Sequence, residues 1–104
     1  MSNRLDQLLK LHAADPRDAD LPYMVALEHA KAGDTAEAIG WLDKTLALDP
    51  HYHYAYFQKA KALDEEGEQS DAIAVLDEGI AKATQASDTK ALGELQELRL
   101  ALMD

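Results

Sequence analysis

The sequence predicts an all-α fold in which about six helices pair as antiparallel hairpins and the hairpins stack on one another. The chain repeats itself with a period of 34 residues, because Leu48-Asp49-Pro50 echoes Ala14-Asp15-Pro16 and the two prolines are 34 positions apart. Alanine and leucine supply most of the apolar content, and both favour helices. No segment shows the apolar–polar alternation that is typical of a strand.

The two repeats match at many further positions with the same offset. These positions pair Ala26 with Ala60, Gly33 with Gly67, Ala38-Ile39 with Ala72-Ile73, Leu42 with Leu76, and Asp43 with Asp77. Small and large apolar residues therefore recur in register, which is expected when each repeat buries its apolar face against its neighbours. Function is then expected on the surface that the stack creates.

Proline and glycine mark the ends of the first two predicted helices. The first covers about 2–14 and ends at Asp15-Pro16, since the residue before a proline avoids the helical conformation. The second begins near Asp18 or Asp20, either of which can cap a helix, and ends at Gly33. Short proline turns join the hairpins and short glycine turns lie within them.

Capping and turn residues also mark the ends of the remaining predicted helices. The third opens at Asp34, and Glu37 is placed to reach back to the cap in an acidic capping box. The fourth runs from about His53 to Glu66 and is stopped by Gly67, the fifth begins near Gln69, and a polar break precedes the sixth. As one domain over 1–104, the predicted layout is a half-repeat helix at 2–14, repeats at 19–52 and 53–86, and a capping helix at 88–103.

Composition excludes several classes of function. The net charge is −10, with −4 over residues 1–52 and −6 over residues 53–104, so no basic patch is available for nucleic acid or anionic lipid. No segment approaches the ~20 apolar residues that span a membrane, and the N-terminus has no long apolar stretch. The absence of cysteine permits a reducing compartment. We expect a cytoplasmic protein that binds neither nucleic acid nor membrane.

These residues resemble the tetratricopeptide repeat family, in the small residues at Ala26 and Ala60, the turns at Gly33-Asp34 and Gly67-Glu68, and the ending Leu46-Ala47-Leu48-Asp49-Pro50. The resemblance covers two full repeats and implies a right-handed stack. Gly79 departs from the pattern, because it replaces an expected alanine at the position of Thr45 one repeat earlier. The family resemblance implies a non-catalytic scaffold or adaptor that binds a protein or peptide in a concave groove.

The resemblance also assigns the groove to the first helix of each repeat. Helical geometry places the groove residues on the face opposite Val25, Ala26 and His29. The predicted groove residues are Tyr23, Leu27, Lys31, Tyr54, Phe57 and Lys61. The four apolar side chains would anchor the partner, and the two lysines would pair with its carboxylates. The alternative is that flanking helices bury this strip as core.

One binding mode of the family is not expected here. It grips a C-terminal carboxylate with a fixed set of lysine, asparagine and arginine side chains. The matching positions in this chain are Tyr23, Leu27, Phe57 and Lys61, so the set is absent.

Neither catalysis nor metal binding is predicted, and no cofactor is expected. The chain has no glycine-rich phosphate loop, no nucleophile elbow and no His-Glu zinc motif. His51 and His53 are two positions apart and would diverge on a helix, and no second ligand pair has metal-site spacing. His12 and His29 lie on faces predicted to be buried, so a structural role with satisfied nitrogens is expected for each.

The last helix has more apolar residues than a cap requires. Ala91, Leu95, Leu98 and Leu102 form one stripe, which is enough to cover the stack, and Leu100 lies on the far side. The surplus residues could bind a second copy or a partner helix. The alternative function is therefore self-assembly, with a homodimer formed through this C-terminal helix.

Overall fold

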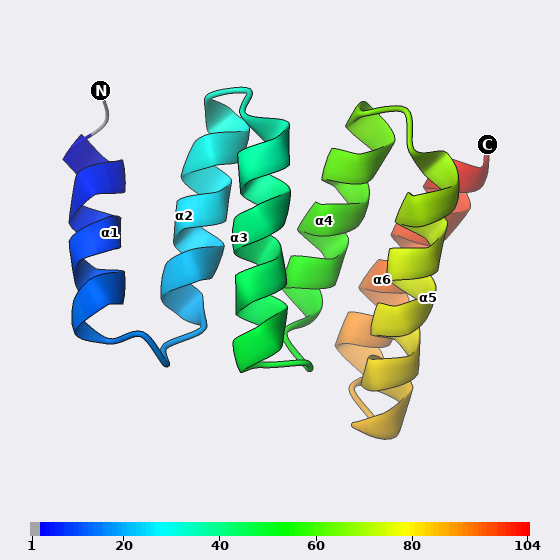
Figure 1. Cartoon of the computed structure of the whole chain (residues 1–104). Coiled ribbons are helices and arrows are strands. Elements are labelled where there is room, and N and C mark those ends of the chain that lie inside the picture. Colours follow the sequence, from blue (N-terminus) through cyan, green and yellow to red (C-terminus); the bar gives the residue numbers. More distant parts are fainter. Residues whose placement is uncertain (1–2) are drawn as a thin grey trace. The chain divides into compact units, whose positions relative to one another are not determined.

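The computed structural model describes residues 3–104, and the regular structure in this range is entirely helical (Figure 1). The elements are α1 Asn3–Ala14, α2 Asp20–Lys31, α3 Thr35–Leu48, α4 His53–Glu65, α5 Gln69–Gln85 and α6 Thr89–Met103. Each begins and ends close to its predicted bounds, although Ser2, where the first helix was expected to start, lies outside the described residues. The all-α class of helical hairpins is confirmed.

The chain forms two compact units, one ending at Pro50 and one beginning at His51. In the first unit α2 and α3 pair as an antiparallel hairpin and α1 packs on α2 (Figure 1). In the second unit α4 and α5 form the equivalent hairpin, and α6 packs on both of them. The last helix therefore covers α4 as well as α5, which matters for the site described below.

Three turns within the units have the same hydrogen-bonded geometry. At Gly33, Gly67 and Ser87 the backbone enters the left-handed region, with φ of 83°, 78° and 55°. The next residue donates its N–H to the carbonyl five positions earlier, each time at 2.9 Å, which is the Schellman arrangement: Asp34 to His29, Glu68 to Leu63, and Asp88 to Ala83. Sequence reasoning missed the third member of this set, because serine stands where the other turns have glycine.

The capping of the helices differs from the expected pattern. Asp34 occupies the cap position of α3, but its side chain makes no capping hydrogen bond, so the predicted acidic capping box with Glu37 is wrong. The Asp34 carboxylate lies instead 3.7 Å from Nδ1 of His29, across the turn. Asp88 does cap α6, because its Oδ1 accepts a hydrogen bond of 3.0 Å from the N–H of Ala91.

The departure at Gly79 is explained by Tyr56. A Cβ atom at Gly79 would lie 2.8 Å from Cγ and 2.9 Å from Cβ of Tyr56, closer than real atoms approach. Tyr56 is buried on α4 and takes the volume that a side chain on α5 would need. One repeat earlier the same two positions hold Pro22 and Thr45, both fully buried. The two repeats therefore fill equivalent positions with opposite combinations of residue size.

We predict that Gly79→Ala destabilises the protein although alanine is the better helix former. Overpacking costs about 1–3 kcal/mol, and the gain in helix propensity offsets up to about 1 kcal/mol of it, so a net loss of about 1–2 kcal/mol is expected. Urea denaturation followed by circular dichroism measures it. Gly93→Ala is the matched control, since a Cβ there meets nothing within 4 Å and the change should stabilise α6. A Gly79→Ala protein as stable as the control would contradict the tight contact.

We predict that Ser87→Gly stabilises the third turn. An L-residue in the left-handed region costs roughly 1–2 kcal/mol, and the larger entropy that glycine loses on folding removes roughly half of the gain, leaving about 0.5–1 kcal/mol. The reverse change, Gly67→Ser, should lower the free energy of unfolding by a similar amount. Thermal melting of both variants checks the prediction. If the melting temperature shifted in the same direction in both variants, the backbone φ would not determine the effect of these substitutions on stability.

Candidate functional site

One face of α4 carries the second half of the predicted groove. Tyr56 and Ala60 are buried, whereas Tyr54 is 38% exposed and Lys61 is exposed on the other side of the helix. Phe57 is half-buried at the edge between the two sides. Nζ of Lys61 lies 5.8 Å from the centroid of the Phe57 ring, one helical turn away. The three predicted residues of α4 therefore do share one accessible face.

Phe57 opens into a hollow between α4 and α6, which we call the α4–α6 hollow. Its volume is about 310 Å³, and its lining residues are Phe57, Glu94, Glu97, Leu98 and Ala101. Ligand pockets usually measure roughly 300–1,000 Å³, so this hollow suits one or two side chains of a peptide. Phe57 on one wall faces the apolar side chains of α6 on the other, an arrangement that can hold an apolar anchor.

The polar groups of the hollow are the carboxylates of α6. Oε1 of Glu94 is inaccessible to water and has no hydrogen-bond partner among the described residues. Its nearest cation-forming group is His53, the first residue of α4, whose Nε2 lies 3.9 Å away and is likewise without a hydrogen bond. This separation is too long for a hydrogen bond. Within residues 3–104, Glu97 forms neither an ion pair nor a side-chain hydrogen bond.

The other half of the predicted groove lies on α2, in the first unit. Tyr23 and Leu27 are half-buried on this helix, and Val25 and Ala26 are buried on its opposite side, as the predicted facing requires. Lys31 is exposed, and its Nζ lies 3.8 Å from Oε1 of Glu28.

Glu28 links Lys31 to α1 as well. The same Oε1 of Glu28 accepts a shorter contact of 2.8 Å from Nε of Arg4 on α1. Two cations share this carboxylate, so the charge of Lys31 is already partly matched by its own chain.

Sequence reasoning identified Phe57 but missed the wall opposite it. Glu94, Glu97 and Ala101 recur every three or four residues along one edge of the buried stripe of α6. That spacing is visible in the sequence, but glutamates beside an apolar stripe are the normal border of a surface helix. Only the packing of α6 on α4 shows that this border faces Phe57.

The histidines have structural surroundings, although they are not all satisfied. His12 packs edge-on against Trp41, with ring centroids 5.5 Å apart, and its Nδ1 is buried without a hydrogen bond. The expectation of satisfied nitrogens is therefore wrong for His12. Nε2 of His53 is likewise buried without a hydrogen bond. Among the described residues, no group of three or more histidine or carboxylate side chains could hold a metal ion. In the same range, no helix has the length and apolar character needed to cross a bilayer.

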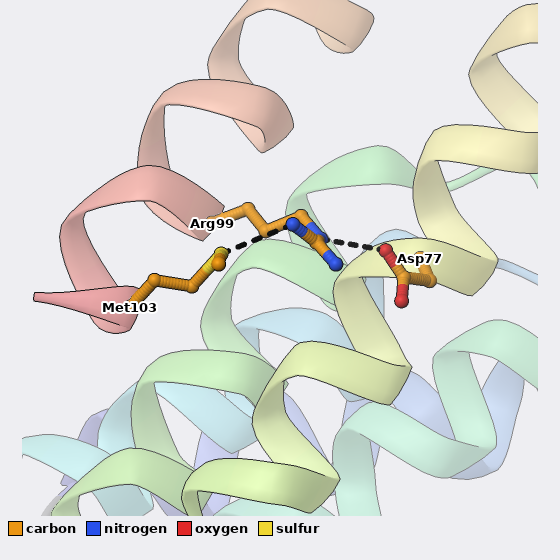
Figure 2. A network of polar contacts seen from close by, with 3 residues as sticks. All are labelled: Asp77, Arg99 and Met103. Atoms are coloured by element: carbon orange, nitrogen blue, oxygen red, sulfur yellow. Dashed lines mark hydrogen bonds and ion pairs between the residues drawn. The ribbon is translucent and has the colours of Figure 1, made fainter.

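The outer face of α6, together with the neighbouring face of α5, is the second accessible apolar surface. Leu100 is 68% exposed and Met103 is 56% exposed. Figure 2 shows the polar contacts beside them, in which Nε of Arg99 donates to Oδ1 of Asp77 on α5 at 2.7 Å and Nη1 of Arg99 contacts the sulfur of Met103 at 3.1 Å. The side chain of Arg99 on α6 is thus held against α5. Shallow hollows on this face are lined by Ile73 and Ile80.

Two hairpins with a common 34-residue period and the same turn define a helical repeat protein. The family description "Tetratricopeptide repeat" matches residues 29–96, which is more than half of the chain. The chain belongs to the tetratricopeptide repeat family. Proteins with this fold are commonly protein-interaction modules and are generally non-catalytic.

Solved structures share this fold. A tetratricopeptide repeat domain protein from Salinibacter ruber is 30% identical, with a TM-score of 0.77 over 85% of this chain and 89% of that one. The TPR2B domain of yeast Sti1, solved in a complex with pHsp70, has a TM-score of 0.86 at 24% identity, over 95% of this chain and 79% of that one. A protein from Bordetella parapertussis has a TM-score of 0.82 at 23% identity, over 99% of this chain and 90% of that one. No curated protein matches significantly.

Proposed function

We propose that this chain is a non-catalytic adaptor that binds a peptide segment of a partner protein in the α4–α6 hollow. The observation that carries the proposal is the accessible ring of Phe57 facing Leu98 and Ala101 across a hollow of about 310 Å³. An apolar side chain of a partner that enters this space is removed from water where it packs against Phe57, Leu98 and Ala101. Burial of apolar surface contributes about 25 cal/mol per Å², so a single anchor side chain contributes most of the binding free energy of a short peptide.

The fold supports the proposal independently of the hollow. The family commonly mediates protein interactions, and the Sti1 domain of the same fold was solved in a complex with pHsp70. The repeat positions also predict Tyr23 and Leu27 on α2 as groove residues. The proposed binding site uses the second unit alone, where Tyr54 and Phe57 lie on α4.

The two lysines have different places in this proposal. Lys61 is accessible beside Phe57 and would orient a partner, whereas Lys31 already lies near Glu28 and would contribute less. The place of action would be the cytoplasm.

Selection from a displayed library of random twelve-residue peptides tests the proposal. We expect enrichment on the wild-type protein and loss of it on Phe57→Ala, because the substitution removes the ring from one wall of the hollow. Phe57 is half-buried, so the variant should keep its helical circular dichroism spectrum.

A second variant protects this test against a failure of Phe57→Ala to fold. Ala101→Tyr adds bulk at an exposed position of the hollow rim and should block it without disturbing the buried residues of α6. Equal enrichment on the wild type and on folded Ala101→Tyr would place binding elsewhere and contradict the proposal.

A second candidate function is self-assembly through the outer face of α6. The observation that favours it is the exposure of Leu100 and Met103 beside the hollows lined by Ile73 and Ile80. Clustered apolar side chains on an accessible face are typical of interaction surfaces. A homodimer that buries this face would be isologous, with the same patch contributed by each copy.

Self-assembly predicts a mass that rises with protein concentration and returns to that of the monomer in Leu100→Lys. The substitution lies at an exposed position, so the free energy of unfolding of the monomer should change by less than about 0.5 kcal/mol. Size-exclusion chromatography coupled to light scattering measures the mass. A wild-type monomer over the whole concentration range would exclude this candidate.

A further inference from the structure

The lining of the α4–α6 hollow contains two carboxylates, whereas the charged residues of the predicted groove were lysines. We propose that its ligand is a cationic peptide, in which an apolar anchor residue is flanked by lysine or arginine. This inference rests on the proposed function above and adds the chemical class of the partner. It differs from the earlier expectation, in which lysines of this chain were to select carboxylates of the partner.

Glu94 provides the first reason. Its side chain is 32% exposed and lines the hollow, while Oε1 is buried and lacks a hydrogen bond. The nearest protein group that could compensate it is Nε2 of His53, at 3.9 Å, and this contact carries charge only when the imidazole is protonated. A carboxylate removed from water without full compensation is unfavourable. An ammonium or guanidinium group of a ligand would supply the missing positive charge at the accessible part of Glu94.

Glu97 adds a second negative charge one helical turn along the same wall. No ion pair within residues 3–104 neutralises it, and Arg99, the nearby cation of α6, is engaged by Asp77 on the outer face of the helix. Two carboxylates spaced three positions apart on a helix lie close together. Their combined field favours a cation over any neutral group and disfavours a carboxylate-bearing ligand.

The rest of the second unit strengthens this preference. From His51 to Asp104 there are five basic and eleven acidic residues, which gives a net charge of −6. A negative potential of this kind attracts cationic partners over long range and speeds their association. The field alone lacks specificity, so the apolar walls of the hollow are needed to select the anchor residue.

Lys61 fixes the direction in which such a peptide would lie. Its ammonium group is near Phe57 on the α4 wall, whereas both carboxylates are on the α6 wall. The cationic residue of the ligand is therefore expected towards α6, and the anchor side chain over the ring of Phe57. One lysine against two glutamates leaves the hollow negative.

The experiment compares the peptides that are enriched on the wild type with those enriched on two charge variants. Glu94→Gln/Glu97→Gln keeps the shape of the hollow and removes two negative charges. Glu65→Gln/Glu66→Gln removes the same number from exposed positions outside the hollow lining, so the two proteins have equal net charge. We expect peptides with net positive charge and an apolar residue on the wild type and on the control, and loss of the charge preference on the first variant.

Binding of one enriched peptide, labelled with fluorescein, is then measured by fluorescence anisotropy. The dissociation constant should rise at least about tenfold for Glu94→Gln/Glu97→Gln and less than about twofold for the control, because only close charge pairs contribute strongly to affinity. Rising salt should weaken binding to the wild type more than to the first variant.

Three outcomes would overturn the inference. Enriched peptides that are acidic or neutral, yet lose binding on Phe57→Ala, would keep the proposed function and reject the cationic ligand. If both charge variants lose the preference for cationic peptides equally, the peptides are attracted to the acidic surface as a whole and not to the hollow. Absence of any enrichment over Phe57→Ala would reject the proposed function and the inference together.

Discussion

The contact between Tyr56 and Gly79 is the constraint on which the second unit depends. Tyr56 is 2% exposed, and its ring occupies the place of a side chain on α5. This contact fixes the rotation of α4 about its own axis. Phe57 follows Tyr56 by one residue, which turns its side chain by roughly 100° around the helix. The burial of one aromatic residue against α5 thus directs the next one towards α6 and into the hollow.

The sequence was sufficient for the helices, because their ends depend on local chemistry. Prolines after Asp15 and Asp49, and glycines at positions 33 and 67, act within a few residues of their own position. The turn at Ser87 could not be recognised in this way. Its backbone is left-handed at Ser87, and serine, unlike glycine, has no preference for that conformation, so the residue type does not mark the turn.

The candidate site was only half predictable, for a related reason. Helical periodicity puts Tyr54, Phe57 and Lys61 on one side of α4, where the structure has Tyr54 and Lys61 exposed and Phe57 half-buried. The opposite wall depends on which helix packs against α4, and that is a long-range contact that no spacing within α4 contains. The charge of the wall was also hidden, because the acidic residues are spread along the chain and Glu94 and Glu97 do not form a run.

The two accessible surfaces of α6 lie on different sides of the helix. At 100° per residue, the hollow-lining residues Glu94 and Leu98 are roughly opposite Met103, whereas Glu97, on the same lining, is only about 60° from Leu100. The buried stripe of Ala91 and Leu95 lies beside the hollow and away from the outer face. A second copy centred on Met103 would therefore leave Glu94 and Leu98 uncovered, whereas one centred on Leu100 would approach Glu97. The two proposed uses of α6 are thus compatible only for a dimer contact on the Met103 side, and such a dimer would present two hollows to a bivalent partner and bind it with increased avidity.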